Sequence, residues 1–154
     1  KQAGLAEKAA KPSRLPAPTI DLPLPAYIPE EYVSDISSRS NLYQNLVKLE
    51  AIEQIEEIAQ EFSDRFGALP EEVKNLLYSV KVRVLAARAG IESISTEDGQ
   101  IILRLFPGMH FDKQKLEPFL KDGVKVGITQ LRLNYRRLGS EWKQVLEEVL
   151  RRIR

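Results

Sequence analysis

The spacing of hydrophobic residues changes several times along this 154-residue chain and divides it into predicted elements. In the first segment, residues 19–33, Ile20, Leu22 and Leu24 alternate with polar residues and prolines. Proline has no N–H to donate to a strand ladder, so this segment predicts one short strand at the edge of a sheet.

Helical spacing begins after Asp35, which together with Ser37 and Ser38 is a candidate N-cap. The face predicted to be buried in this first helix is formed by Leu42, Leu46 and Leu49, with Tyr43 and Val47 widening it. We expect the helix to break near Glu50–Ala51.

A second helix is predicted up to Gly67, which is expected to adopt the left-handed conformation that commonly ends helices. A third is predicted from Pro70, since proline suits a first turn, to Gly90. The apolar face of the second helix contains Ile55, Ile58, Ala59, Phe62 and Phe66. The third helix has a stripe of Val73, Leu76, Leu77, Val80 and Val84. Its solvent side is expected to carry Lys74, Lys81, Arg83 and Arg88.

After Gly90 the period drops to two, which is typical of strands. Asp98-Gly99 predicts a tight hairpin turn before residues 100–106. A short helix is expected over residues 112–120, capped by Asp112, and a second strand pair over 124–135. The last helix, from Ser140, has a closely helical apolar stripe: Trp142, Val145, Leu146, Val149, Leu150 and Ile153.

This order predicts an α+β fold: a block of about three helices, then short antiparallel hairpins and an amphipathic C-terminal helix. Residues 1–18, rich in Ala, Lys and Pro, are interpreted as a linker from a preceding domain, and residues 19–154 as one domain. The sequence starts without Met, which suggests a piece of a longer protein.

The composition indicates the cellular compartment and the general class of protein. The chain has 43% hydrophobic and 29% charged residues and no cysteine, which is the usual mix of a globular protein in a reducing compartment. It contains no run of about 18 apolar residues and no apolar signal core at its start, so neither a membrane span nor export is predicted. We expect a cytoplasmic protein.

Candidate catalytic residues are few. The one histidine, His110, has neither a second histidine nor a cysteine to share a metal with, and a loop position is the simpler interpretation. Phosphate-binding glycine motifs and a nucleophile-elbow motif are absent from the sequence. The carboxylates of the second helix, Glu53, Glu56, Glu57 and Glu61, lie opposite its apolar stripe and should be solvated. The sequence therefore predicts no enzyme, no metal and no cofactor.

A basic segment, residues 131–137, is the strongest candidate for binding. Residues 1–69 contain 7 Lys/Arg against 11 Asp/Glu, whereas residues 70–154 contain 16 against 11. If residues 131–137 continue as a strand, its polar face carries arginines that could meet phosphate or an acidic protein surface. The candidate surface is Lys121, Lys125, Arg132, Arg136 and Arg137. A solvated strand face, an acidic protein partner and a nucleic acid all remain open as interpretations.

Three segments carry a resemblance to a known family. They are DLPLPAYIPEEYVSDISSRSNLYQNL (21–46), IEEIAQEFSDRFGALPEEVKNLL (55–77) and VRVLAARAGI (82–91). With the D-R-F-G-x-L-P spacing, they resemble the C-terminal domain of the bacterial transcription-repair coupling factors, the Mfd family, over roughly residues 19–106. One departure is Ala51, where relatives tend to place a Thr or Ser that would cap the second helix.

The resemblance implies a parent that is a multidomain ATP-dependent DNA translocase. Such a parent removes stalled RNA polymerase from double-stranded DNA and recruits the repair protein UvrA. ATP and Mg are implied for its motor domains only. The resemblance implies that the terminal domain is non-catalytic and masks the UvrA-binding surface of an N-terminal UvrB-like module, as an autoinhibitory contact. An accessory nucleic-acid-binding module is the alternative.

Overall fold

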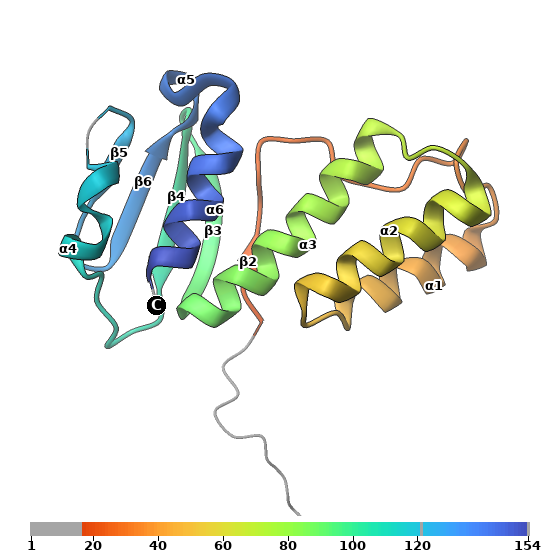
Figure 1. The fold of residues 1–154 in the computed structure, drawn as a ribbon, viewed down its shortest axis with the longest axis horizontal. Helices are drawn as coiled ribbons and strands as arrows, with labels where there is room; N and C mark the ends of the chain where they lie inside the picture. The colour runs from red at the N-terminus through yellow and green to blue at the C-terminus, as the bar shows by residue number, and fades with distance from the viewer. Residues whose placement is uncertain (1–16, 121, 154) are drawn as a thin grey trace, which may run out of the picture.

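The computed structural model describes residues 17–120 and 122–153, which form two lobes joined by one long helix (Figure 1). The helices are α1 (Ile36–Val47), α2 (Ile52–Phe66), α3 (Glu71–Ala89), α4 (Lys113–Leu116), α5 (Tyr135–Leu138) and α6 (Trp142–Ile153). The strands are β2 (Thr19–Ile20), β3 (Ile91–Glu97), β4 (Gln100–Leu105), β5 (Val124–Val126) and β6 (Gln130–Asn134). Short 3-10 turns follow α4 (Glu117–Phe119) and precede α6 (Gly139–Glu141).

The predicted α+β class is confirmed, with one strand pairing that the pattern did not predict. The sheet order is β2-β3-β4-β6-β5, and β2 pairs with β3 in parallel while all other pairs are antiparallel. The edge position of β2 was predicted from its prolines. Its parallel direction arises because three helices intervene before the chain returns to the sheet at β3.

The Asp98-Gly99 turn joins β3 to β4 as predicted. Both residues have positive φ, 50° and 78° respectively, which is the conformation of the primed turns that suit hairpins.

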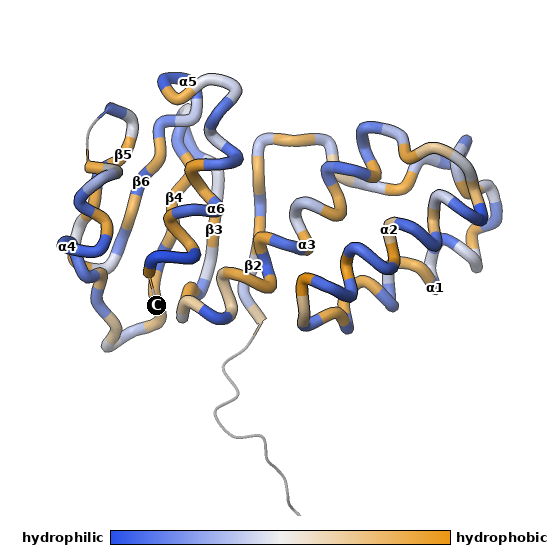
Figure 2. The backbone as a smooth tube through the Cα atoms, viewed as in Figure 1, coloured by the Kyte–Doolittle hydropathy of each residue, from blue (hydrophilic) through white to orange (hydrophobic). Residues whose placement is uncertain are grey.

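Two hydrophobic cores lie on either side of α3. The sheet-lobe core packs one sheet face, including Ile94, Leu103 and Leu131, against α3 and α6. The helical-lobe core contains the buried side chains of α1 and α2, such as Leu46 and Phe62. Figure 2 shows the repeating hydrophobic and hydrophilic positions along α2 and α6 that this packing requires.

Helix α3 contributes to both cores, so it has buried residues on more than the one predicted stripe. Val73, Leu77 and Val80 pack in the helical lobe, whereas Val82 and Leu85 pack in the sheet lobe. We refer below to residues 21–80 as the helical lobe and to β2 with residues 81–153 as the sheet lobe.

The helix ends follow local sequence signals. Asp35 caps α1 by accepting hydrogen bonds from the N–H and hydroxyl of Ser38, both at 2.8 Å, and these bonds lower the pKa of its carboxyl. Ala51 stands at the N-cap of α2 and cannot cap with its side chain. The amide oxygen of Gln54 instead accepts from the N–H groups of Glu50 and Ala51, at 2.9 and 3.1 Å. Gly90 ends α3 in the left-handed conformation, as predicted.

Two details of the predicted helix faces were wrong. Val47 is 72% exposed, and Tyr43 lies at the surface with its hydroxyl accepting from the N–H of Ile28 at 2.7 Å. On α3, Lys81 and Arg83 are half-buried instead of fully solvated. Lys81 pairs with Glu147 of α6 at 3.0 Å, and Arg83 donates to the carbonyls of Leu46 and Leu49 at 2.9 and 3.1 Å. Both cations face a neighbouring element because α3 is enclosed by both lobes.

Candidate interaction surface on the sheet

The sheet has a second face, turned away from α3 and α6, on which polar side chains predominate. The strand register aligns Ser95 of β3, Ile102 of β4, Arg132 of β6 and Lys125 of β5 in one row across four strands. Ile102 is only 1% exposed, so this face has a small apolar centre beneath its polar side chains.

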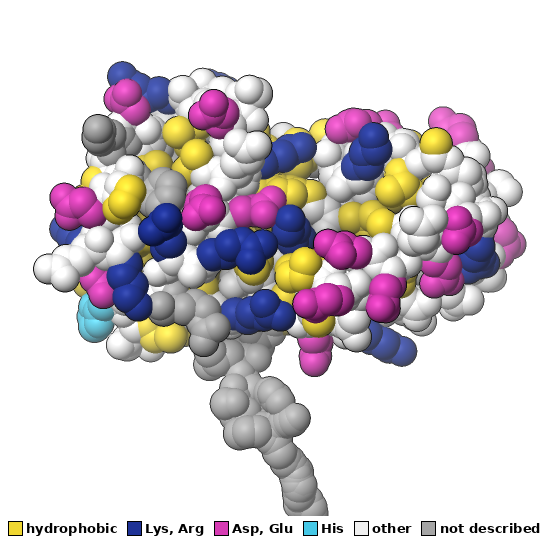
Figure 3. Space-filling model, in the orientation of Figure 1, with side chains coloured by type: hydrophobic (Ala, Val, Ile, Leu, Met, Phe, Trp, Pro, Cys, Tyr) yellow, Lys and Arg dark blue, Asp and Glu magenta, His cyan; other side chains and the backbone are white. Residues whose placement is uncertain are grey.

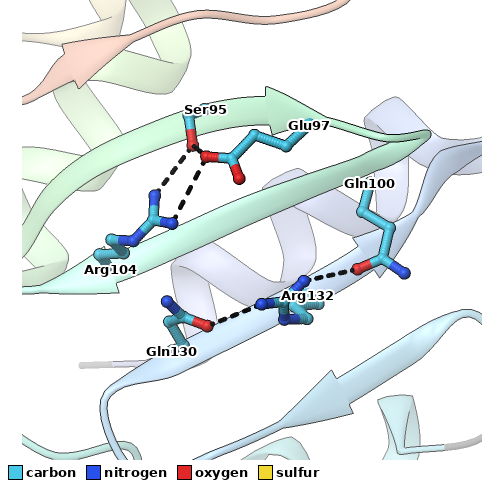
Figure 4. A network of polar contacts seen from close by, with 6 residues as sticks. All are labelled: Ser95, Glu97, Gln100, Arg104, Gln130 and Arg132. Atoms are coloured by element: carbon cyan, nitrogen blue, oxygen red, sulfur yellow. Dashed lines mark hydrogen bonds and ion pairs between the residues drawn. The ribbon is translucent and has the colours of Figure 1, made fainter.

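Two arginines on this face have different electrostatic surroundings (Figure 4). Arg104 donates to the Ser95 hydroxyl at 3.0 Å and pairs with the Glu97 carboxylate at 3.4 Å. Arg132 donates to the amide oxygens of Gln100 and Gln130, at 3.2 and 3.3 Å. An amide positions a guanidinium without neutralising it, so the charge of Arg132 stays available to an external anion.

Lys125 and Arg132 lie directly opposite each other in the β5–β6 pair, and both are exposed. Like charges in opposed positions are destabilising in a sheet. An anionic group placed between them would relieve that repulsion, which makes this pair the centre of the candidate surface.

Arg136 and Arg137 are not on the strand, contrary to the prediction. The side-chain oxygen of Asn134 accepts from the N–H of Arg137 at 3.0 Å, which caps α5 and turns the chain at Tyr135. Because the strand ends there, the alternation assumed for residues 131–137 fails after Asn134. Lys121, the remaining predicted residue, lies outside the described residues.

The turn nevertheless keeps these arginines near the strand residues. A hollow of about 130 Å³ is lined by Arg132, Lys125 and Arg137 together with Gln100, Gly123 and Asn134. A neighbouring hollow of about 390 Å³ is lined by Asp98, Gly99, Asn134, Arg136 and Arg137. The guanidinium of Arg136 lies over the bare backbone of Gly99, where an added Cβ would be 3.4 Å from its atoms.

Two carboxylates lie beside this surface: Asp98, which lines the larger hollow, and Asp122. Asp122 lies 4.0 Å from Arg137, but the two side chains are 87% and 65% exposed, and such pairs contribute little in water. Three of the five predicted residues, Lys125, Arg132 and Arg137, therefore line one cationic hollow, and Arg136 lines the hollow beside it. The partner that sequence reasoning missed is Gln100, which lies at the start of β4 opposite Asn134, at the end of β6. Only the strand register brings them together.

The described part of the chain includes the predicted metal and carboxylate candidates. It contains no group of three or more His, Cys, Asp or Glu placed to hold a metal. His110 is exposed in the loop after β4. The α2 carboxylates Glu53, Glu56, Glu57 and Glu61 are exposed, as predicted. Among the described helices, none combines the length and apolar character that crossing a membrane requires.

Charge is separated between the two lobes more sharply than between the sequence halves. Residues 21–80 contain 12 Asp/Glu and 4 Lys/Arg, whereas residues 81–153 contain 14 Lys/Arg and 9 Asp/Glu. In Figure 3, acidic side chains are spread over the helical lobe, and most Lys and Arg lie over the sheet lobe. The molecule is therefore strongly dipolar although its net charge is only +1.

Comparison with known proteins identifies a family model and relatives that this chain matches. The family model described as TRCF domain matches residues 22–116. The transcription-repair-coupling factor of Staphylococcus epidermidis (strain ATCC 35984) is 32% identical over 138 residues, covering 86% of this chain and 12% of that protein. That of Rickettsia bellii is 36% identical over 89 residues, covering 58% of this chain and 8% of that protein. This chain thus spans about a tenth of the length of these relatives.

A solved structure shares the architecture. The crystal structure of the C-terminal domain of a transcription-repair coupling factor aligns with a TM-score of 0.74 at 21% identity, covering 89% of each chain. The chain is therefore an α+β domain with the fold of that C-terminal domain. It belongs to the TRCF domain family, the C-terminal domain of the transcription-repair coupling factors.

Proposed function

We propose that this domain is a non-catalytic intramolecular module that masks the UvrA-binding surface of a UvrB-like N-terminal module in its parent protein. The observation that carries the proposal is membership of the TRCF domain family over residues 22–116. The parent would be a bacterial, cytoplasmic, ATP-dependent DNA translocase that acts on stalled RNA polymerase. ATP and Mg would bind its motor domains.

A masking role requires a stable fold, a tether and a contact that can be broken. A short flexible tether raises the effective concentration of the partner to about mM, so a weak contact can hold the closed state. Charged surfaces suit a reversible contact, because electrostatic complementarity gives specificity and speed more than raw affinity. The charge separation between the lobes supports this role.

We propose that the contact is the cationic hollow of Lys125, Arg132 and Arg137, together with Arg136 of the neighbouring hollow. Lys121 is the further candidate from the sequence. Arg132 is held by two neutral amides, and Lys125 lies opposite it. A pair of carboxylates on the partner could bind both cations at once. A bidentate carboxylate–guanidinium pair is among the stronger polar contacts.

The role is tested by UvrA binding to the full-length parent and to a version lacking the residues that correspond to 19–154. We expect the deletion to expose the UvrA site and strengthen binding by at least about tenfold, which corresponds to about 1.4 kcal/mol. Unchanged UvrA affinity would contradict the masking role.

The position of the contact is tested separately in the full-length parent. Lys125→Glu/Arg132→Glu should strengthen UvrA binding as the deletion does. Glu53→Lys/Glu57→Lys, on the exposed face of α2, is the control with an equal number of charge reversals. If only the control releases UvrA binding, the masking contact lies on the helical lobe and the assignment to the sheet is wrong.

A second function, nucleic-acid binding, is favoured by one observation: the opposed cations Lys125 and Arg132 could also hold a phosphate. It predicts DNA affinity that falls steeply with salt and is reduced by Arg132→Ala. If DNA does not bind even at low salt, this alternative is excluded.

A further inference from the structure

A second hollow lies in the helical lobe, far along the chain from the cationic surface. Its volume is about 340 Å³, and it lies where the segment before α1 crosses the start of α3. The lining residues are Tyr27, Pro29, Glu31, Tyr32, Pro70 and Glu72, and we refer to this site as the Tyr27 groove.

The walls of the Tyr27 groove are fixed by hydrogen bonds. The N–H of Tyr27 donates to the carbonyl of Glu72 at 3.3 Å, which ties the segment to α3. The Tyr32 hydroxyl donates to the carbonyls of Phe62 and Gly67, at 3.1 and 2.8 Å, and its ring packs against Phe66 at 5.6 Å between centroids. A groove held in this way needs little reordering when a ligand enters.

Tyr27 is the lining residue whose side chain can adjust to a ligand. It is 47% exposed, and its hydroxyl has no hydrogen-bond partner within the part of the chain that the structure describes. Beside it, Tyr32, Pro29 and Pro70 present aromatic and pyrrolidine surfaces. Aromatic-lined grooves of this kind recognise the polyproline II conformation, which loses little entropy on binding.

The charge around the Tyr27 groove favours a ligand that carries a cationic side chain. Glu31 and Glu72 line it, Glu30 and Glu71 are their sequence neighbours, and no Lys or Arg is among the lining residues. The acidic pair Glu71 and Glu72 also counters the positive end of the α3 dipole. A cation placed here would meet carboxylates beside the exposed ring of Tyr27 and the half-buried ring of Tyr32.

We infer that the Tyr27 groove binds an extended, proline-containing peptide segment of a partner protein, with a Lys or Arg side chain directed at Glu31 and Glu72. The prolines pack on the two tyrosines and on the chain's own prolines. This site is independent of the masking contact proposed for the sheet lobe, so either assignment can fail without the other.

The probe is an acetylated and amidated peptide, Ala-Pro-Pro-Arg-Pro-Pro-Ala, titrated into the isotope-labelled 154-residue chain and followed by NMR. We expect saturable shifts confined to residues 27–32 and 70–73. Tyr27→Ala and Glu72→Gln should each weaken binding about fivefold or more. Glu56→Gln, an exposed carboxylate on α2, is the matched control and should bind the peptide as the parent chain does.

Both variants are expected to fold. The Tyr27 side chain is half exposed, and the bond from Tyr27 to Glu72 uses the backbone carbonyl. Amide spectra of the free variants check this directly. Three results would overturn the inference: absence of saturable shifts, equal binding of a peptide with Glu in place of Arg, or affinity unaffected by both variants.

Discussion

Gly67 gives the corner between α2 and α3 a backbone conformation that other residues rarely adopt. It has φ 96° and ψ −172°, a conformation that is essentially restricted to glycine. An added Cβ would meet no atom within 4 Å, so a side chain there would cost backbone strain and nothing else. The prediction of a left-handed helical glycine at this position was wrong: φ is positive, but the ψ of −172° puts Gly67 outside that region.

Gly67→Ala should lower the free energy of unfolding by about 1–3 kcal/mol, measured by urea titration. Asparagine tolerates the left-handed helical region, but Gly67 is not in that region. Gly67→Asn should therefore be as destabilised as Gly67→Ala, and Ala68→Ser is the exposed neighbouring control. A clear recovery of stability with asparagine would show that the backbone here is left-handed helical.

Among elements, the predictions succeeded where one local signal sufficed. Gly90 ended a helix, Asp98-Gly99 formed a hairpin, and Asp112 capped a short helix whose end tightens into a 3-10 turn at Pro118. The predictions failed where the environment of a side chain depended on residues far away in the sequence. The environment of Arg83 is an example, because its bonding partners lie 34 and 37 residues earlier in the chain.

Arg83 joins α3 to the C-terminal end of α1. Its guanidinium donates to the carbonyl of Leu46, in the last turn of α1, and to that of Leu49, just beyond this helix. Burial lowers the pKa of Arg83, and Glu50 opposes that change. Arg83→Met should lower the free energy of unfolding by about 1.5–3 kcal/mol, the usual contribution of a hydrogen bond to a charged group.

Arg88→Met is the matched control for Arg83→Met, since Arg88 is exposed on the same helix. Urea unfolding of both variants measures the difference. If they lose equal stability, the contact from Arg83 to α1 contributes nothing beyond the loss of a surface cation.

At the scale of the whole molecule, two features could not be predicted from the sequence. The first is the parallel return of β3 beside β2, which brings residues 19–20 and 93–94 together across three helices. The second is the candidate surface, where Gln100, Arg132 and Lys125 meet only through the register of β4, β6 and β5. Both are long-range pairings, for which hydrophobic spacing carries no signal.

The sharing of α3 between two cores predicts that both lobes unfold together. Trp142, the one tryptophan, packs against the sheet-lobe core, as does its edge-to-face partner Tyr78 of α3, and so reports on the sheet lobe. Leu77→Ala removes a buried side chain from the helical lobe and should cost about 2–5 kcal/mol. We expect the urea midpoint of Trp142 fluorescence to fall together with that of far-UV circular dichroism.

The control for Leu77→Ala is Leu120→Ala, an exposed leucine outside both cores. It should leave both midpoints nearly unchanged. An unaltered Trp142 midpoint in Leu77→Ala would mean that the lobes unfold independently.

The continuous helix α3 also determines how the molecule transmits force. With 19 residues and a rise of about 1.5 Å per residue, it is a rod of about 28 Å that is clamped by both cores. Bending it would break backbone hydrogen bonds or open a core. A partner that tilts the sheet lobe must therefore also move the α2–α3 corner and the Tyr27 groove, because α3 connects them rigidly.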